Sequence, residues 1–164
     1  KVVGADGTNT TEIVVGPSPY NPTWSPDDTK IAYAACQPAQ KNQCGILVYD
    51  LNTKVAKMIT QDGGGNPQWS PRGDKIVYQA GNPNVFVVNA DGSGGIKQLT
   101  FGKSHDGQPV WSSDGSFIFW RSDQDGKGWA IFVMRADGSD KRLLISNALI
   151  DQDRWGYESL SASP

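Results

Sequence analysis

The stretch that decides the fold is Asn66-Pro67-Gln68-Trp69-Ser70-Pro71-Arg72-Gly73, because the chain carries it in three versions. Residues 21–28 read Asn-Pro-Thr-Trp-Ser-Pro-Asp-Asp, and residues 108–115 read Gln-Pro-Val-Trp-Ser-Ser-Asp-Gly. The three tryptophans and a fourth, Trp155, follow one another at intervals of roughly 42 to 45 residues. A sequence that repeats at this interval predicts one structural unit built several times along the chain.

A second marker recurs at a similar interval and in the same phase. Ala90-Asp91-Gly92-Ser93 and Ala136-Asp137-Gly138-Ser139 have counterparts in Ala5-Asp6-Gly7-Thr8 and Tyr49-Asp50-Leu51-Asn52. Two markers in one phase are strong evidence for a repeat, because each would have to arise independently by chance.

Each unit predicts four β-strands. A short strand ends in the tryptophan, and a Ser-Pro-Asp-Gly-like turn leads to an alternating strand such as residues 75–78. An apolar strand such as residues 85–88 follows, and an Asp-Gly turn leads to a fourth strand such as residues 97–100. Four strands in about 40 to 45 residues are typical of a propeller blade, so we expect an all-β β-propeller of four-stranded antiparallel blades.

We interpret residues 1–164 as a single, partial propeller with three complete blades near 20–60, 64–100 and 107–145. Residues 1–15 would supply strands three and four of another blade, and residues 152–164 a first strand. In the alternative, a four-bladed ring, these two pieces would share one blade, but residues 157–164 lack the pattern of a second strand. We expect the missing blades to come from the rest of a parent chain or from another protomer.

Composition favours many short strands over helices, with 19 Gly, 10 Pro and 6 Trp in 164 residues. The chain has 15 Lys and Arg against 17 Asp and Glu, so it lacks the excess of basic residues that is typical of a nucleic-acid-binding protein. No apolar run approaches the roughly 18 to 20 residues that span a bilayer. We therefore expect neither nucleic acid nor a membrane span.

The motif [Asn/Gln]-Pro-x-Trp-Ser, followed by Ile-x-Tyr/Phe, Asp-Gly-Ser and Leu-Thr, resembles the TolB-type (WD-like) β-propeller repeat over essentially the whole chain. The resemblance implies a ring of about six blades. It says less about function, because related repeats occur in periplasmic Tol-system proteins, in propellers attached to serine peptidases and in surface proteins. Asp28 departs from the pattern in replacing the turn glycine, and Ser113 in replacing the proline.

The two cysteines, Cys36 and Cys44, flank the loop between the second and third strands of the first complete unit. Antiparallel pairing of these strands would bring the cysteines together, so we predict a disulfide rather than two buried free thiols. A disulfide indicates an oxidising compartment, which we take to be the periplasm or the extracellular space.

Residues suited to metal or catalytic chemistry are scarce. One histidine and two cysteines are too few for a structural zinc site, and neither a Gly-x-Ser-x-Gly elbow nor a phosphate-binding Walker motif is present. In residues 123–126 every second residue carries a carboxylate, as in a calcium-binding loop. The glutamate that completes such a loop is missing, so the tip of a hairpin is the better interpretation. We expect no catalytic residue, metal or cofactor.

The recurring tryptophans and the variable loops have different predicted roles. A residue repeated once per blade is expected to pack between blades, so we assign Trp24, Trp69, Trp111 and Trp155 to the core. The loops from strand two to three and from unit to unit emerge on one face and differ in chemistry, as expected of a binding surface on a rigid frame. Its candidate binding residues are Tyr20, Asp62, His105, Asp106, Asp153 and Arg154.

These features predict a non-enzymatic protein- or peptide-binding or scaffold module, exported to the periplasm or cell surface. One alternative is the propeller domain of a prolyl-oligopeptidase-like peptidase whose catalytic domain lies outside this chain. Another is a glycan-binding or glycan-acting propeller.

Overall fold

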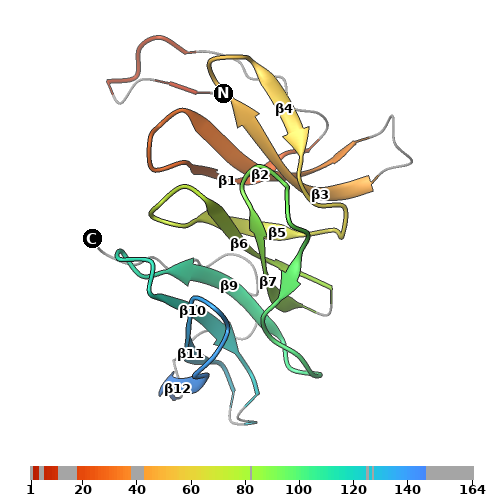
Figure 1. The fold of residues 1–164 in the computed structure, drawn as a ribbon, viewed down its shortest axis with the longest axis vertical. Helices are drawn as coiled ribbons and strands as arrows, with labels where there is room; N and C mark the ends of the chain where they lie inside the picture. The colour runs from red at the N-terminus through yellow and green to blue at the C-terminus, as the bar shows by residue number, and fades with distance from the viewer. Residues whose placement is uncertain are drawn as a thin grey trace.

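The computed structural model describes residues 2–3, 6–10, 18–37, 43–81, 83–124, 126 and 128–146. These residues form three four-stranded antiparallel sheets, each with its strands in sequence order (Figure 1). We number them blades 1 to 3. Blade 1 contains β1 (Tyr20–Trp24), β2 (Lys30–Gln37), β3 (Gln43–Asp50) and β4 (Val55–Met58); blade 2 contains β5 (Gly65–Trp69), β6 (Lys75–Ala80), β7 (Asn84–Asn89) and β8 (Lys97–Gln98); blade 3 contains β9 (Asp106–Trp111), β10 (Phe117–Ser122), β11 (Ala130–Arg135) and β12 (Arg142–Ile145).

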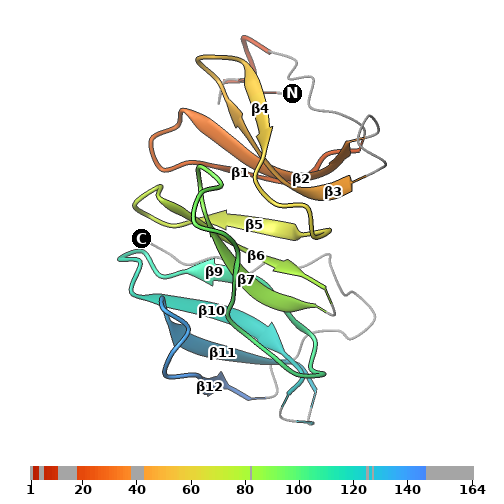
Figure 2. The same cartoon turned by 45° about the vertical axis from the view of Figure 1, so that its right-hand side comes forward.

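The blades stack in a row, with blade 1 at the N-terminal end and β12 at the other end (Figures 1 and 2). Three such sheets confirm the predicted all-β partial propeller. The third strand of each blade extends beyond its predicted apolar stretch, because pairing with the second strand continues past it. Within the described residues, no helix is long and apolar enough to cross a membrane.

The Asn/Gln-Pro pair shapes the first strand of each blade. Asn21, Asn66 and Gln108 have φ angles of 50°, 49° and 50°, in the left-handed region that asparagine tolerates better than most residues. The pairing of each first strand with its neighbour shifts register beside this residue, as in a β-bulge. The repeated dipeptide therefore encodes a repeated bend.

The serine after each tryptophan closes the next hairpin. In blade 2 the Ser70 hydroxyl accepts a hydrogen bond from the Lys75 amide at 3.1 Å and donates to Asp74 Oδ1 at 2.8 Å. Blades 1 and 3 repeat the arrangement from Ser25 and Ser112. Each serine satisfies a backbone donor that the tight turn would otherwise leave unpaired.

The tryptophans join neighbouring blades. Trp69 and Trp111 are buried, and their indole nitrogens donate to the carbonyls of Thr23 and Gln68 in the preceding blade, at 3.2 and 3.3 Å. Trp24 departs from its expected core position, because its side chain is 47% exposed. The reason is that no complete preceding blade covers it within the described residues.

Two predicted terminal pieces are described in part or not at all. Val2 packs against the cluster of Ile31, Tyr33 and Leu47 on the outer side of blade 1. Residues 11–15 and 152–164, which include Asp153, Arg154 and Trp155, lie outside the described residues.

Candidate functional site

The blade-to-blade loops and the loops between second and third strands emerge at the same end of the blades, because adjacent strands are antiparallel. We call this end the loop face. Its described part comprises residues 18–20, 36, 44, 59–65, 79–81, 83–84, 99–108, 121–124, 126 and 128–130.

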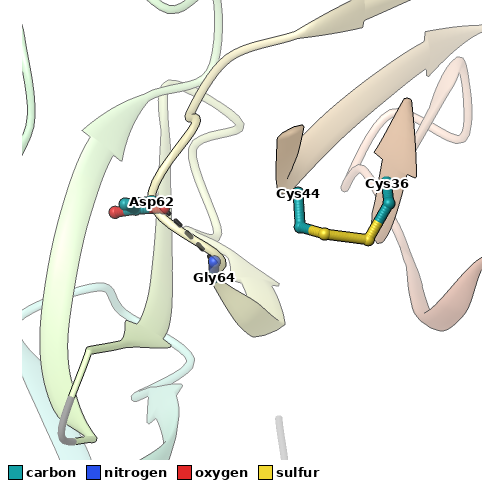
Figure 3. Close-up of a disulfide and its surroundings, with 4 residues drawn as sticks. All are labelled: Cys36, Cys44, Asp62 and Gly64. Atoms are coloured by element: carbon teal, nitrogen blue, oxygen red, sulfur yellow. Dashed lines mark hydrogen bonds between the residues drawn. A yellow bond between two sulfur atoms is a disulfide. The ribbon is translucent and has the colours of Figure 1, made fainter. Parts of the chain in front are cut away.

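The predicted disulfide lies on the loop face of blade 1 (Figure 3). Cys36 and Cys44 pair directly across β2 and β3, and their Cα atoms are 3.9 Å apart. The Cys44 carbonyl accepts a hydrogen bond from the Gly63 amide at 2.9 Å. The disulfide-linked hairpin is thereby tied to the loop that leads into blade 2.

Asp62 is exposed in that loop, yet both of its carboxylate oxygens are engaged. Oδ2 accepts from the Tyr78 hydroxyl at 2.7 Å. Oδ1 accepts from the Gly64 amide at 3.3 Å, and Figure 3 shows this second bond. Burial, and then the bond to Asp62, raise the pKa of Tyr78 far above its usual value, so the hydroxyl stays protonated and donates. A Cβ at Gly64 would come within 2.6 Å of the Tyr78 ring, so this turn needs glycine.

Among the described residues of the loop face, two large aromatic side chains are exposed. Tyr20 is 46% exposed and lies beside Gly65, and Phe101 is 68% exposed in the loop from blade 2 to blade 3. Phe101 is absent from the sequence-derived candidates. The available signal was its position after Leu99-Thr100, where the first blade has the polar Gln61.

His105 is fixed by Asp123, which lies in the loop after β10. Nδ1 of His105 is 2.7 Å from Asp123 Oδ2, and its amide donates to Oδ1 at 2.8 Å. Partial burial raises the pKa of Asp123, but the hydrogen bonds from His105 outweigh it and the net effect is a lowered pKa. The His105 ring also lies near the indole of Trp129, with 6.4 Å between centroids.

Asp106 is not a surface residue, which corrects its placement among the candidate binding residues. It is 1% exposed, its amide donates to the Pro83 carbonyl at 2.8 Å, and its Oδ1 accepts from the Trp120 indole at 3.3 Å. Its carboxylate satisfies a buried indole N–H, which explains why it lies inside although the adjacent His105 is exposed.

Blade 3 also buries a cation beneath the loop face. Arg121 is 1% exposed, its Nη1 donates to Gln108 Oε1 at 3.0 Å, and its guanidinium lies 5.0 Å from the ring centroid of Trp129. This stacking holds Trp129 against β10. Within the described residues, no group of three or more His, Cys, Asp or Glu could hold a metal ion.

A pocket of about 460 Å³ lies at the opposite end of the blades, between blades 1 and 2. Its two lysines already have partners. Lys30 Nζ donates to Asp50 Oδ2 at 2.7 Å, which lowers the pKa of Asp50 to about 2, and Lys75 Nζ donates to Asn89 at 3.3 Å. Because these partners belong to the fold, the pocket is a weaker binding candidate than the loop face.

Comparison with known families matches residues 1–156 to the TolB beta propeller domain. The chain belongs to the TolB β-propeller family. This agrees with the three stacked sheets and with the tryptophans that link them.

Solved structures with the same fold include a protein assigned as TolB from Agrobacterium tumefaciens, which is 22% identical with a TM-score of 0.69. The alignment covers 80% of this TolB-family chain and 50% of that structure. The propeller of the trilobed protease from Pyrococcus furiosus is 15% identical with a TM-score of 0.61, covering 79% and 43%. A chain of a nidogen/laminin complex is also 15% identical with a TM-score of 0.61, covering 79% and 49%. The TolB-family chain thus spans about half of the structures it resembles or less.

Proposed function

We propose that this TolB-family chain is a non-enzymatic module whose loop face docks a protein or peptide partner. The observation that carries the proposal is the exposure of Tyr20 and Phe101 on this face, from two different junctions of a repeated frame. Aromatic side chains are enriched at protein interfaces, where they supply large contact areas.

The rigidity of the loop face supports the same role. Three backbone amides in these loops donate hydrogen bonds to other segments: Gly63 to Cys44, His105 to Asp123, and Asp106 to Pro83. The loops around the aromatic residues are therefore tied to strands or to one another. Binding to a preorganised surface loses less conformational entropy than binding to free loops. We therefore expect the partner to meet a largely preformed surface.

The disulfide supports an exported location for the module. Both cysteines of the chain belong to it, and cytosolic thiols are normally kept reduced. We accordingly place the partner in the periplasm or outside the cell.

The experiment is affinity capture from a periplasmic or secreted-protein extract, with bound proteins quantified by mass spectrometry. We expect Tyr20→Ala combined with Phe101→Ala to reduce captured partner about 30-fold, the effect of losing about 2 kcal/mol of aromatic contact. The matched control combines Val55→Ala with Ile96→Ala, which removes two exposed apolar side chains at the opposite end of the blades.

Equal loss with the control pair would contradict the proposal, because binding would then not depend on the loop face. The proposal would also be wrong if the loop-face variant kept its protein partners and instead lost binding on a glycan array.

A further inference from the structure

The pocket between blades 1 and 2 has a volume of about 460 Å³, within the range of about 300 to 1,000 Å³ for small-molecule sites. Both blades contribute to its walls, and both have all four strands. Its lining includes two lysines, an amide, a carboxylate, a hydroxyl and an indole, from Lys30, Lys75, Asn89, Asp91, Ser93 and Trp69. The pocket therefore combines hydrogen-bond donors and acceptors with an aromatic side chain.

One cross-strand position beside this pocket carries a different pair in each blade. The second and third strands place Lys30 opposite Asp50, Lys75 opposite Asn89, and Phe117 opposite Arg135. In blade 1 the pair is a salt bridge, with 2.7 Å between Lys30 Nζ and Asp50 Oδ2. Blade 2 keeps the lysine but has an amide in place of the carboxylate.

Lys75 is consequently only weakly neutralised by the fold. Its Nζ is 3.3 Å from Asn89 Oδ1, an uncharged acceptor, and 3.8 Å from Asp74 Oδ2, which is too far for a hydrogen bond. The Lys75 side chain is 44% exposed, so a ligand can reach it. A ligand carboxylate would have at Lys75 the place that Asp50 has at Lys30.

Blade 3 fills the equivalent position with its own side chains. The Arg135 guanidinium lies 5.9 Å from the centroid of the Phe117 ring, and its Nε is 3.8 Å from Asp140 Oδ2. In blades 1 and 3 the fold thus supplies a charged or aromatic partner at this position, whereas in blade 2 it supplies a neutral amide.

The remaining groups of the pocket suit hydroxyls and C–H groups. Asn89 Nδ2 donates to Ser93 Oγ at 3.2 Å, and the Ser93 amide donates to Asp91 Oδ1 at 2.8 Å, so these side chains are held together. Hydroxyl and carboxylate oxygens can accept further bonds from ligand hydroxyls. Lys57 Nζ donates to the Asp91 carbonyl at 2.7 Å, and this cation offsets the charge of the Asp91 carboxylate. The Trp69 indole offers an apolar contact.

We propose that this pocket binds a small sugar acid, with its carboxylate on Lys75, its hydroxyls on Asp91 and Ser93, and C–H groups of its ring against Trp69. The bond to Lys75 would be charge-assisted, like that between Lys30 and Asp50. The pocket lies at the end of the blades opposite the loop face, so the inference goes beyond the proposed docking function and does not rest on it.

Isothermal titration calorimetry with D-glucuronate and D-galacturonate tests the ligand class. Glucose and galactose are the matched neutral sugars, because they differ from these acids only in carrying a hydroxymethyl group in place of the carboxylate. Acetate has a carboxylate without the hydroxyls. We expect at least one of the two acids to bind about tenfold or more tightly than its neutral counterpart and than acetate.

Two substitutions test the position of the ligand. Lys75→Gln removes the cation and should weaken binding of the acid about tenfold or more. Asn89→Asp should weaken it by a similar factor, because it restores the Lys–Asp pair of blade 1 and so occupies Lys75 and repels the ligand. Asn89→Asp adds an ion pair to the fold, and urea unfolding should show that its stability is retained.

Lys103→Gln is the matched control, since it removes the same charge from an exposed position in the loop between blades 2 and 3. It should leave binding of the acid within about twofold, because salt screens exposed charges outside the pocket. The variant with both Tyr20→Ala and Phe101→Ala should also leave it unchanged, which separates this site from the loop face.

The proposal is overturned if neither acid binds saturably, or if the neutral sugars or acetate bind as tightly as the acids. It is also overturned if Lys103→Gln weakens binding as much as Lys75→Gln, because net charge and not the pocket would then govern binding. Undiminished binding in Asn89→Asp would show that the carboxylate does not lie on Lys75, and would overturn it too.

Discussion

At the scale of single residues, Asp28 departs from the repeated hairpin turn, and this departure costs conformational free energy. Gly73 and Gly115 both have a φ of 72°, and Asp28 occupies the same place in blade 1 with a φ of 56°. A left-handed backbone costs residues with a side chain roughly 1 to 2 kcal/mol, although aspartate tolerates it better than most. The absence of glycine at residue 28, visible in the sequence, therefore identifies a strained turn.

We predict that Asp28→Gly raises the free energy of unfolding by about 0.5 to 1 kcal/mol, because it relieves this strain. Urea unfolding followed by tryptophan fluorescence measures the change. Gly73→Ala is the matched control and should lose about 1 kcal/mol, since alanine would have to adopt the same φ. A loss of stability in Asp28→Gly would show that the aspartate side chain contributes more than its conformation costs.

At the scale of elements, the β2–β3 hairpin is the one that the chain cross-links, through Cys36 and Cys44. The disulfide closes a short loop, which restricts the unfolded chain, and the Gly63–Cys44 hydrogen bond extends this order to the neighbouring loop. Pairing across a hairpin is a local property of two adjacent strands, so the sequence was sufficient to predict it.

We predict that replacing both cysteines by serine lowers the free energy of unfolding by about 2.5 kcal/mol, the chain-entropy value for a loop of this size. Urea unfolding with and without a reductant measures it. The reductant should shift the midpoint of the unmodified chain and leave the serine variant unchanged. If the reductant shifted neither, the disulfide would have no stabilising role.

At the scale of the whole molecule, stability comes from the stacking of blades, since each blade buries its faces against its neighbours. The tryptophans report on this stacking, because the same residue is buried at two junctions and exposed at the end of the row. Repetition in the sequence made them appear equivalent, whereas their surroundings differ.

We predict that Trp69→Ala destabilises the chain by about 3 to 5 kcal/mol, whereas Trp24→Ala costs less than about 1 kcal/mol. The difference follows from the 8% exposure of Trp69 and the 47% exposure of Trp24. Thermal unfolding should be compared at a protein concentration at which the chain is monomeric. Equal costs would mean that Trp24 is also packed in solution.

The candidate surface was predictable only in part. Tyr20, Asp62 and His105 lie on the loop face, since turn and loop positions follow from the strand pattern. Asp106 is buried, which the sequence did not indicate, and Phe101 is exposed, for which its position after Leu99-Thr100 was the one available signal. The burial of Asp106 depends on Trp120 and Pro83, whose proximity arises only when the strands pair and the blades stack.

The sequence alone determined the blade period, the four strands of each blade, the Ser-Pro-Asp-Gly-like turns and the disulfide, because these depend on residues close together in the chain. The tertiary structure decided which tryptophan is covered and which aspartate is buried. The physical reason is that hairpin geometry and turn conformation are local, whereas burial depends on which blade lies next to which. The same repeated tryptophan is therefore buried at two junctions and exposed in blade 1.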